Sequence, residues 1–137
     1  MNPLVSLLLV AILASPAIAE TVVINATPTA KVASGPDETE RLVLAEADRE
    51  KSRLVILKRD GRYLWASREN RELSYQLSGA FHYFIDPAGG GYVKVFDSHM
   101  LPASLRDPGP RYRYMEHVTL WLGTITYWGA TEELRLE

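Results

Sequence analysis

The chain has 137 residues, no cysteine and a formal net charge of -2. This length corresponds to one domain, and the near-neutral charge argues against a nucleic-acid-binding protein, which carries a basic excess. The lack of cysteine excludes disulfides, thiol catalysis, cysteine-based zinc sites and iron–sulfur clusters.

The first 19 residues carry no charged side chain. An apolar run over residues 4–14 is followed by Ser15-Pro16 and then by the small-x-small triplet Ala17-Ile18-Ala19. This layout predicts a secretory signal peptide that is cleaved after Ala19, and therefore a secreted or periplasmic protein. The run is shorter than the roughly 20 residues of a membrane span, so no membrane span is expected after cleavage. The alternative is an uncleaved anchor, because this region has neither Lys nor Arg.

Residues 20–35 are interpreted as a flexible N-terminal segment, in which Thr21 to Ile24 can form a short edge strand. Pro36 to Lys51 is predicted to be a helix at the start of a domain that extends over residues 36–137. Proline suits the first helical position, and the acidic residues that follow it favour a helix N-terminus. The apolar face of this helix is narrow, which predicts a helix that lies on a sheet.

A β-hairpin is predicted over Arg53 to Ser67, because Asp60-Gly61 separates two apolar runs. A type I′ turn needs a positive φ at both central residues, and Asp-Gly is a strong signal for it. The two-residue loop places Leu57 opposite Leu64 and Ile56 opposite Trp65. The strand Leu54 to Leu57 is apolar on both faces, so we expect the helix to cover one of them.

A second hairpin is predicted within Ser74 to Asp97, with its loop at Pro87 to Gly90. Its register follows from the loop, and a slip by one residue would exchange the two faces. The predicted pairs are Ile85 with Tyr92, Tyr83 with Lys94 and Phe81 with Phe96 on one face, and His82 with Val95 and Phe84 with Val93 on the other.

The last third begins with a long irregular segment, Ser98 to Arg111, which contains three prolines. Irregular loops of this length are often binding loops. Tyr112 to Leu122 fits either a strand or a helix, but its β-branched and aromatic residues and the following Gly123 favour strand–turn–strand. The whole pattern predicts an α+β fold, with one N-terminal helix packed on an antiparallel sheet of about five or six strands built from consecutive β-hairpins.

No established catalytic or metal-binding motif is found in the chain. The histidines and acidic residues that we considered as metal ligands or as an acid/base pair have no established metal-site spacing. Gly89 to Gly91 lacks the Lys-Ser/Thr and the helix N-terminus of a phosphate loop, so we interpret it as a hairpin turn. No catalytic residue, metal site or cofactor is therefore predicted. The residues considered are His82, Asp86, Asp97, His99, Glu116 and His117.

Two regions are candidates for binding. The connector Ser67 to Glu72 has side chains of both charge signs and lies beside Trp65, and both Trp and Arg are enriched where binding energy concentrates. Aromatic side chains near the C-terminus can form a stacking surface. The alternatives are a solvated loop and core aromatics, and the exposure of the side chains distinguishes them. The predicted binding residues are Trp65, Arg68, Glu69, Asn70, Arg71, Trp121 and Trp128.

These patterns predict an exported, non-catalytic binding module of the cell envelope or extracellular space that recognises a protein or an envelope polymer. One alternative is a small hydrolase or metal-dependent enzyme that uses histidines and carboxylates near the 97–111 loop. It predicts stoichiometric metal, or a pocket where two of these residues converge: His82, His99, His117, Asp86 and Glu116. The other alternative is a structural accessory of an envelope complex, with an edge strand as its interface.

Overall fold

The computed structural model describes residues 19–106 and 108–137. Nearly all of the predicted signal peptide therefore lies outside the described residues. Within the described part of the chain, no helix is long and apolar enough to cross a membrane.

The described chain is a small single domain built on one ten-stranded antiparallel sheet, with a single α-helix of six residues. The strand order is β1-β4-β5-β6-β7-β8-β9-β10-β2-β3, so each strand from β4 to β10 lies next to its neighbour in the sequence. The elements are β1 (Glu20–Ala26), β2 (Pro28–Ser34), β3 (Thr39–Val43), α1 (Glu46–Lys51), β4 (Leu54–Arg59), β5 (Arg62–Trp65), β6 (Arg71–Ser78), β7 (Phe81–Ile85), β8 (Tyr92–Asp97), β9 (Tyr112–Leu120) and β10 (Gly123–Thr131).

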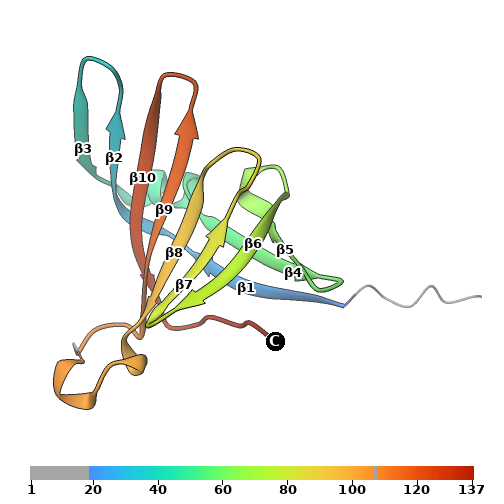
Figure 1. Cartoon of the computed structure of the whole chain (residues 1–137). Helices are drawn as coiled ribbons and strands as arrows, with labels where there is room; N and C mark the ends of the chain where they lie inside the picture. Colours follow the sequence, from blue (N-terminus) through green and yellow to red (C-terminus); the bar gives the residue numbers. More distant parts are fainter. Residues whose placement is uncertain (1–18, 107) are drawn as a thin grey trace, which may run out of the picture.

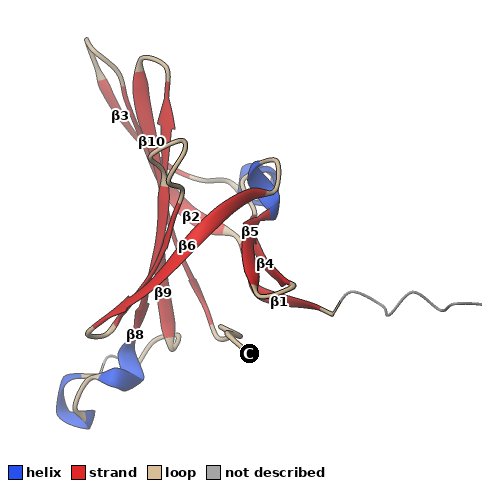
Figure 2. Ribbon diagram, turned by 45° about the vertical axis from the view of Figure 1, so that its right-hand side comes forward, coloured by secondary structure: helices blue, strands red, loops and turns tan. Residues whose placement is uncertain are grey.

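The sheet folds over into two layers (Figures 1 and 2). One layer contains β1, β4, β5 and the start of β6, and the other contains the rest of β6 with β7, β8, β9, β10, β2 and β3. The chain passes between the layers at Thr27, where β1 gives way to β2, again through α1 between β3 and β4, and a third time within β6 after Leu73. Strands that change sheets in this way form the corners of packed sheets.

The core lies between the two layers. Trp65 and Phe84 are its largest fully buried side chains, and they are joined by aliphatic residues from β1, β4 and β8. The C-terminal segment contributes Leu134 and Leu136, which pack against this core. The backbone N–H of Arg135 donates to the carbonyl oxygen of Val23 over 2.9 Å, so this segment lies along β1.

The predicted β4–β5 hairpin is confirmed, because Leu57 pairs with Leu64 and Ile56 with Trp65. Its turn has φ values of 50° at Asp60 and 75° at Gly61, as a type I′ turn requires.

The predicted register of the central hairpin is also confirmed. All five predicted pairs between β7 and β8 are present, from the pair of Ile85 and Tyr92 to the pair of Phe81 and Phe96. The strand–turn–strand interpretation of the C-terminal region is confirmed by β9 and β10, which pair over nine residues each.

The predicted α+β class is wrong, because the protein is mostly β and the sheet has ten strands instead of five or six. Residues 36–43 of the predicted helix over 36–51 are instead the β2–β3 turn and β3, and only Glu46–Lys51 is helical, with no buried residue. Pro36 and Asp37 occupy the turn between β2 and β3. Proline followed by acidic residues is as typical of a β-turn as of a helix start, and pairing with β2 decides between them.

The interpretation of residues 20–35 as a flexible segment is also wrong. They form β1 and β2, in which Val23, Ile24 and Pro28 are buried. β1 pairs with β4 and β2 pairs with β10, so the two partners of this segment lie far along the chain. Neither partner can be recognised from the local sequence.

Candidate functional site

Glu116 is the centre of a buried polar network between the two layers. It lies on β9, and its side chain is only 1% exposed. One carboxylate oxygen accepts a hydrogen bond from Nε1 of Trp65 over 3.0 Å, and the other accepts one from Nη2 of Arg68 over 2.7 Å. The Arg68 guanidinium also lies over the ring of Tyr127, 5.6 Å from its centroid. Each oxygen of the buried Glu116 carboxylate therefore has a hydrogen-bond partner inside the protein. We interpret this network as a contact that stabilises the fold.

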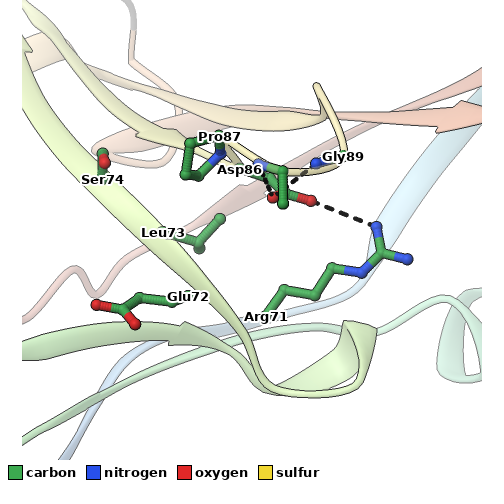
Figure 3. A pocket seen from close by; sticks show the side chains of 8 residues that line it. Arg71, Glu72, Leu73, Ser74, Asp86, Pro87 and Gly89 are labelled. Atoms are coloured by element: carbon green, nitrogen blue, oxygen red, sulfur yellow. Dashed lines mark hydrogen bonds and ion pairs between the residues drawn. The ribbon is translucent and has the colours of Figure 1, made fainter.

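A pocket of about 530 Å³ lies between the start of β6 and the β7–β8 turn (Figure 3). Its polar centre is Asp86, whose Oδ1 accepts hydrogen bonds from the backbone N–H groups of Ala88 and Gly89. Nη1 of Arg71 reaches across the pocket to Oδ2 of Asp86 over 3.3 Å. The carboxylate thus fastens the glycine-rich turn to β6. This contact agrees with the interpretation of Gly89 to Gly91 as a hairpin turn.

The other candidate ligands and acid/base groups have separate partners. Asp97 accepts two hydrogen bonds from the Arg111 guanidinium, both of 3.1 Å. Nδ1 of His82 lies 2.8 Å from the Tyr75 hydroxyl, and Nδ1 of His117 lies 2.9 Å from the hydroxyl of Thr126. Among residues 19–106 and 108–137, no group of three or more His, Cys, Asp or Glu side chains is placed to hold a metal ion.

Two of these groups have shifted pKa values. Burial lowers the pKa of His82 below its ordinary value. Burial acts to raise the pKa of Asp97, but the hydrogen bonds from Arg111 and from the backbone of His99 outweigh it and hold that pKa below its ordinary value.

We expect the free energy of unfolding to decrease as the pH falls from 7.5 to 5.5. The unfolded chain takes up a proton at His82 near pH 6.5, before the folded protein does, so protonation favours unfolding. Urea denaturation of the wild type and of His82→Gln at both pH values measures this difference. The decrease should be smaller in the variant, and an equal decrease would contradict the prediction. Below about pH 4, protonation of Asp97 removes further stability by the same linkage.

The structure separates the residues of the predicted binding connector. Trp65 is 1% exposed and belongs to the core, so its predicted role as a surface anchor is wrong. Arg68 and Arg71 point to Glu116 and Asp86, as described above. Glu69 and Asn70 remain at the surface in a tight turn, with φ values of 60° and 55°.

The predicted C-terminal aromatic surface is also divided. Tyr127 is buried and Trp128 is 39% exposed, and neighbouring residues of a strand point to opposite faces of the sheet. Trp121 is different, because it lies in the turn between β9 and β10 and is 96% exposed. Of the predicted binding residues, Trp121 is the one with a fully available aromatic side chain.

Trp121 lies within an exposed apolar tip made of Leu120, Trp121 and Leu122. The two leucines are 48% and 69% exposed. Leu120 pairs with Gly123, so Trp121 and Leu122 form a two-residue loop. Neither has a positive φ, whereas two-residue hairpin loops favour Asn-Gly or Asp-Gly with positive φ. Turn geometry therefore does not explain Trp-Leu at this position, and burial does not explain it either.

The β2–β3 turn lies beside the apolar tip, as Figure 1 shows. Gly123 allows this approach, because a Cβ at that position would meet the backbone oxygen of Ser34. A groove of about 320 Å³ runs between the two hairpins, and Leu120, Leu122 and Ile125 line it from the β9–β10 side. Glu38 and Glu40 line it from the β2–β3 side. The apolar tip thus has an acidic flank.

No protein family, curated protein or solved structure matches this chain. The functional argument therefore depends on the site itself.

Proposed function

We propose that the protein is an exported, non-catalytic module that binds a partner protein through the apolar tip of Leu120, Trp121 and Leu122. The observation that carries this proposal is the 96% exposure of Trp121 in a turn that requires no tryptophan. The proposed export follows from the signal-peptide pattern of the first 19 residues.

The apolar tip can supply much of the energy that a specific contact needs. A tryptophan side chain buries 150–250 Å², so covering Trp121 corresponds to about 4–6 kcal/mol of gross hydrophobic free energy. Trp is also enriched among the few residues that dominate binding energies. The Asp60-Gly61 turn shows that this fold can accommodate a conventional hairpin loop. The presence of Trp and Leu at the equivalent place in β9–β10 supports a role in binding.

Charge indicates the class of partner. Asp37, Glu38 and Glu40 give the neighbouring turn and β3 a negative potential, with Arg41 as the nearby positive charge on that strand. Acidic side chains beside an apolar tip are repelled by an anionic membrane surface and by an anionic envelope polymer. They favour a protein surface that has an apolar pocket with basic residues at its rim.

We expect Trp121→Ala to weaken binding at least about thirtyfold, because central aromatic residues typically contribute 2 kcal/mol or more. The same change should alter the free energy of unfolding by less than about 0.5 kcal/mol, since the side chain is exposed. A photoreactive amino acid at Thr119, an exposed position next to the apolar tip, captures the partner in the native envelope while Trp121 is kept. Calorimetry with the purified partner then measures both affinities.

Trp128→Ala is the matched control, because it removes a second tryptophan from the same hairpin without changing the apolar tip. Its affinity should stay within about threefold of the wild type. A photoreactive group at Arg62, an exposed position on β5, controls for random contact. The proposal would be rejected if the captured partner bound Trp121→Ala as tightly as the wild type.

A further inference from the structure

β3 is the open edge of the sheet. It is the last strand in the sheet order, it pairs with β2 on one side, and all five of its residues are exposed. Val43, for example, is 88% exposed. β1 at the other end of the order is different, because the C-terminal segment lies along it and donates a hydrogen bond from Arg135 to Val23. The described chain therefore covers β1 and leaves β3 available.

The hydrogen bonds of the β2–β3 hairpin show which backbone groups are free. Gly35 donates to Glu38 over 2.9 Å, and Leu44 donates to Thr29 over 2.9 Å. In an antiparallel pair the hydrogen-bonded positions alternate along the strand, so the even-numbered residues of β3 bond to β2. The N–H and C=O groups of the odd-numbered residues point away from β2. These residues are Thr39, Arg41 and Val43.

We propose that β3 is the edge on which an extended segment of the partner protein adds as a further antiparallel strand. This inference rests on the proposed function and names the form in which the partner binds. Such strand addition takes its affinity from main-chain hydrogen bonds and its specificity from alternate side chains. In the sheet order, β2 and β3 would separate the added strand from β10. A partner that extends around the β2–β3 turn from this strand would also contact the apolar tip.

The side chains of β3 define the chemistry of the added strand. Opposite charges directly across an antiparallel pair are stabilising and like charges are destabilising. A basic residue is therefore favoured opposite Glu40, an acidic residue opposite Arg41, and an apolar residue opposite Leu42. Val43 and Thr39 favour β-branched neighbours. Read in the antiparallel direction, the complementary sequence is Val-Ile-Glu-Lys-Thr.

A second copy of this chain fits the edge less well. In the register that pairs all five residues, Arg41 lies opposite its own counterpart, and Glu40 lies opposite Leu42. The pair of arginines is repulsive, and the pair of Glu40 and Leu42 contributes no favourable side-chain interaction. The charges therefore favour a different protein.

The test uses the mature chain and a synthetic peptide that contains Val-Ile-Glu-Lys-Thr with a serine at each end. Amide hydrogen exchange, measured by NMR, should slow on peptide addition at Thr39, Arg41 and Val43 and stay unchanged at Glu40 and Leu42. A control peptide with Glu and Lys exchanged places like charges opposite each other, and it should bind at least about threefold more weakly. Unchanged exchange at the three odd-numbered residues would overturn the inference.

Arg41→Pro is the matching protein variant. The N–H of Arg41 points away from β2, so proline removes only an outward donor and is tolerated on an edge strand. It should weaken peptide binding at least tenfold, whereas Arg41→Thr, which keeps the N–H, should weaken it less than about fivefold. Circular dichroism checks that both variants fold, and equal binding of the two folded variants would overturn strand addition.

The same variants separate this inference from the proposed function. If binding of the captured partner requires both Trp121 and the Arg41 N–H, the apolar-tip proposal and strand addition are both supported. If it depends on Trp121 but binds Arg41→Pro and Arg41→Thr equally, strand addition is wrong and the apolar tip remains the binding site. If it depends on neither, both are wrong. Concentration-dependent dimerisation with the same slowed amides, without peptide, would identify a second copy as the occupant and overturn the proposed partner.

Discussion

Replacing Arg68 with methionine should lower the free energy of unfolding by about 3–5 kcal/mol at pH 7. The change leaves the carboxylate of Glu116 buried without its charge partner, and breaking a buried ion pair from one side typically has this effect. The pair joins the β5–β6 connection to β9 over 2.7 Å, so its loss acts on the contact between the layers. Urea denaturation followed by circular dichroism measures the difference.

Two controls show whether the loss comes from the buried charge. Arg53→Met removes an exposed ion pair with Glu50, and such pairs contribute about 0–1 kcal/mol. Glu116→Gln combined with Arg68→Met removes both charges and keeps an amide oxygen to accept from Trp65. This double variant should recover at least half of the lost stability. If Arg68→Met were no more destabilising than Arg53→Met, the buried pair would have no special importance.

The hairpins could be predicted because their signals are local. Asp60-Gly61 fixes both the turn type and the register of β4–β5, and these follow from residues within a few positions of each other. Alternation of apolar residues around Pro87 to Gly90 similarly fixes β7–β8. In each case the strand's partner is its sequence neighbour, so one stretch of sequence contains the whole interaction.

The N-terminal part could not be predicted because its partners are distant. β2 pairs with β10, and Trp128 lies opposite Ala30 across almost the whole chain. Nothing within residues 20–35 reveals this pairing. The segment from Pro36 to Lys51 also satisfies local rules for a helix, but its part Thr39–Val43 pairs with β2. Tertiary pairing overrides weak helix propensity in such a case.

The candidate site could be predicted only in part, because burial depends on contacts between residues that are distant in the sequence. The sequence identifies aromatic and charged residues but does not show which of them are buried. Trp65 and Trp121 occur in similar apolar surroundings along the chain, yet one is 1% and the other 96% exposed. Arg68 and Arg71 resemble solvated connector residues, but they form ion pairs with two buried acids, Glu116 on β9 and Asp86 in the β7–β8 turn.

Replacing Trp65 with alanine should lower the free energy of unfolding by about 3–5 kcal/mol, because it leaves a large cavity in the core. The loss also removes the Nε1 donor to Glu116, which leaves a buried carboxylate oxygen without that partner. Trp65→Phe should have a smaller effect, since the ring fills most of the cavity but cannot donate the hydrogen bond. Circular dichroism is the suitable probe, because removal of a tryptophan changes the fluorescence by itself.

Comparison of Trp65→Phe with Trp121→Ala shows which of the two tryptophans contacts the partner. Trp65→Phe should destabilise the protein and leave the affinity of the folded protein for its partner within about threefold, since the side chain is buried away from solvent. Trp121→Ala should leave the free energy of unfolding nearly unchanged and weaken the affinity for the partner. If Trp65→Phe instead reduced affinity as strongly as Trp121→Ala with no loss of stability, Trp65 would be a contact residue. The connector beside it, and not the apolar tip alone, would then belong to the binding surface.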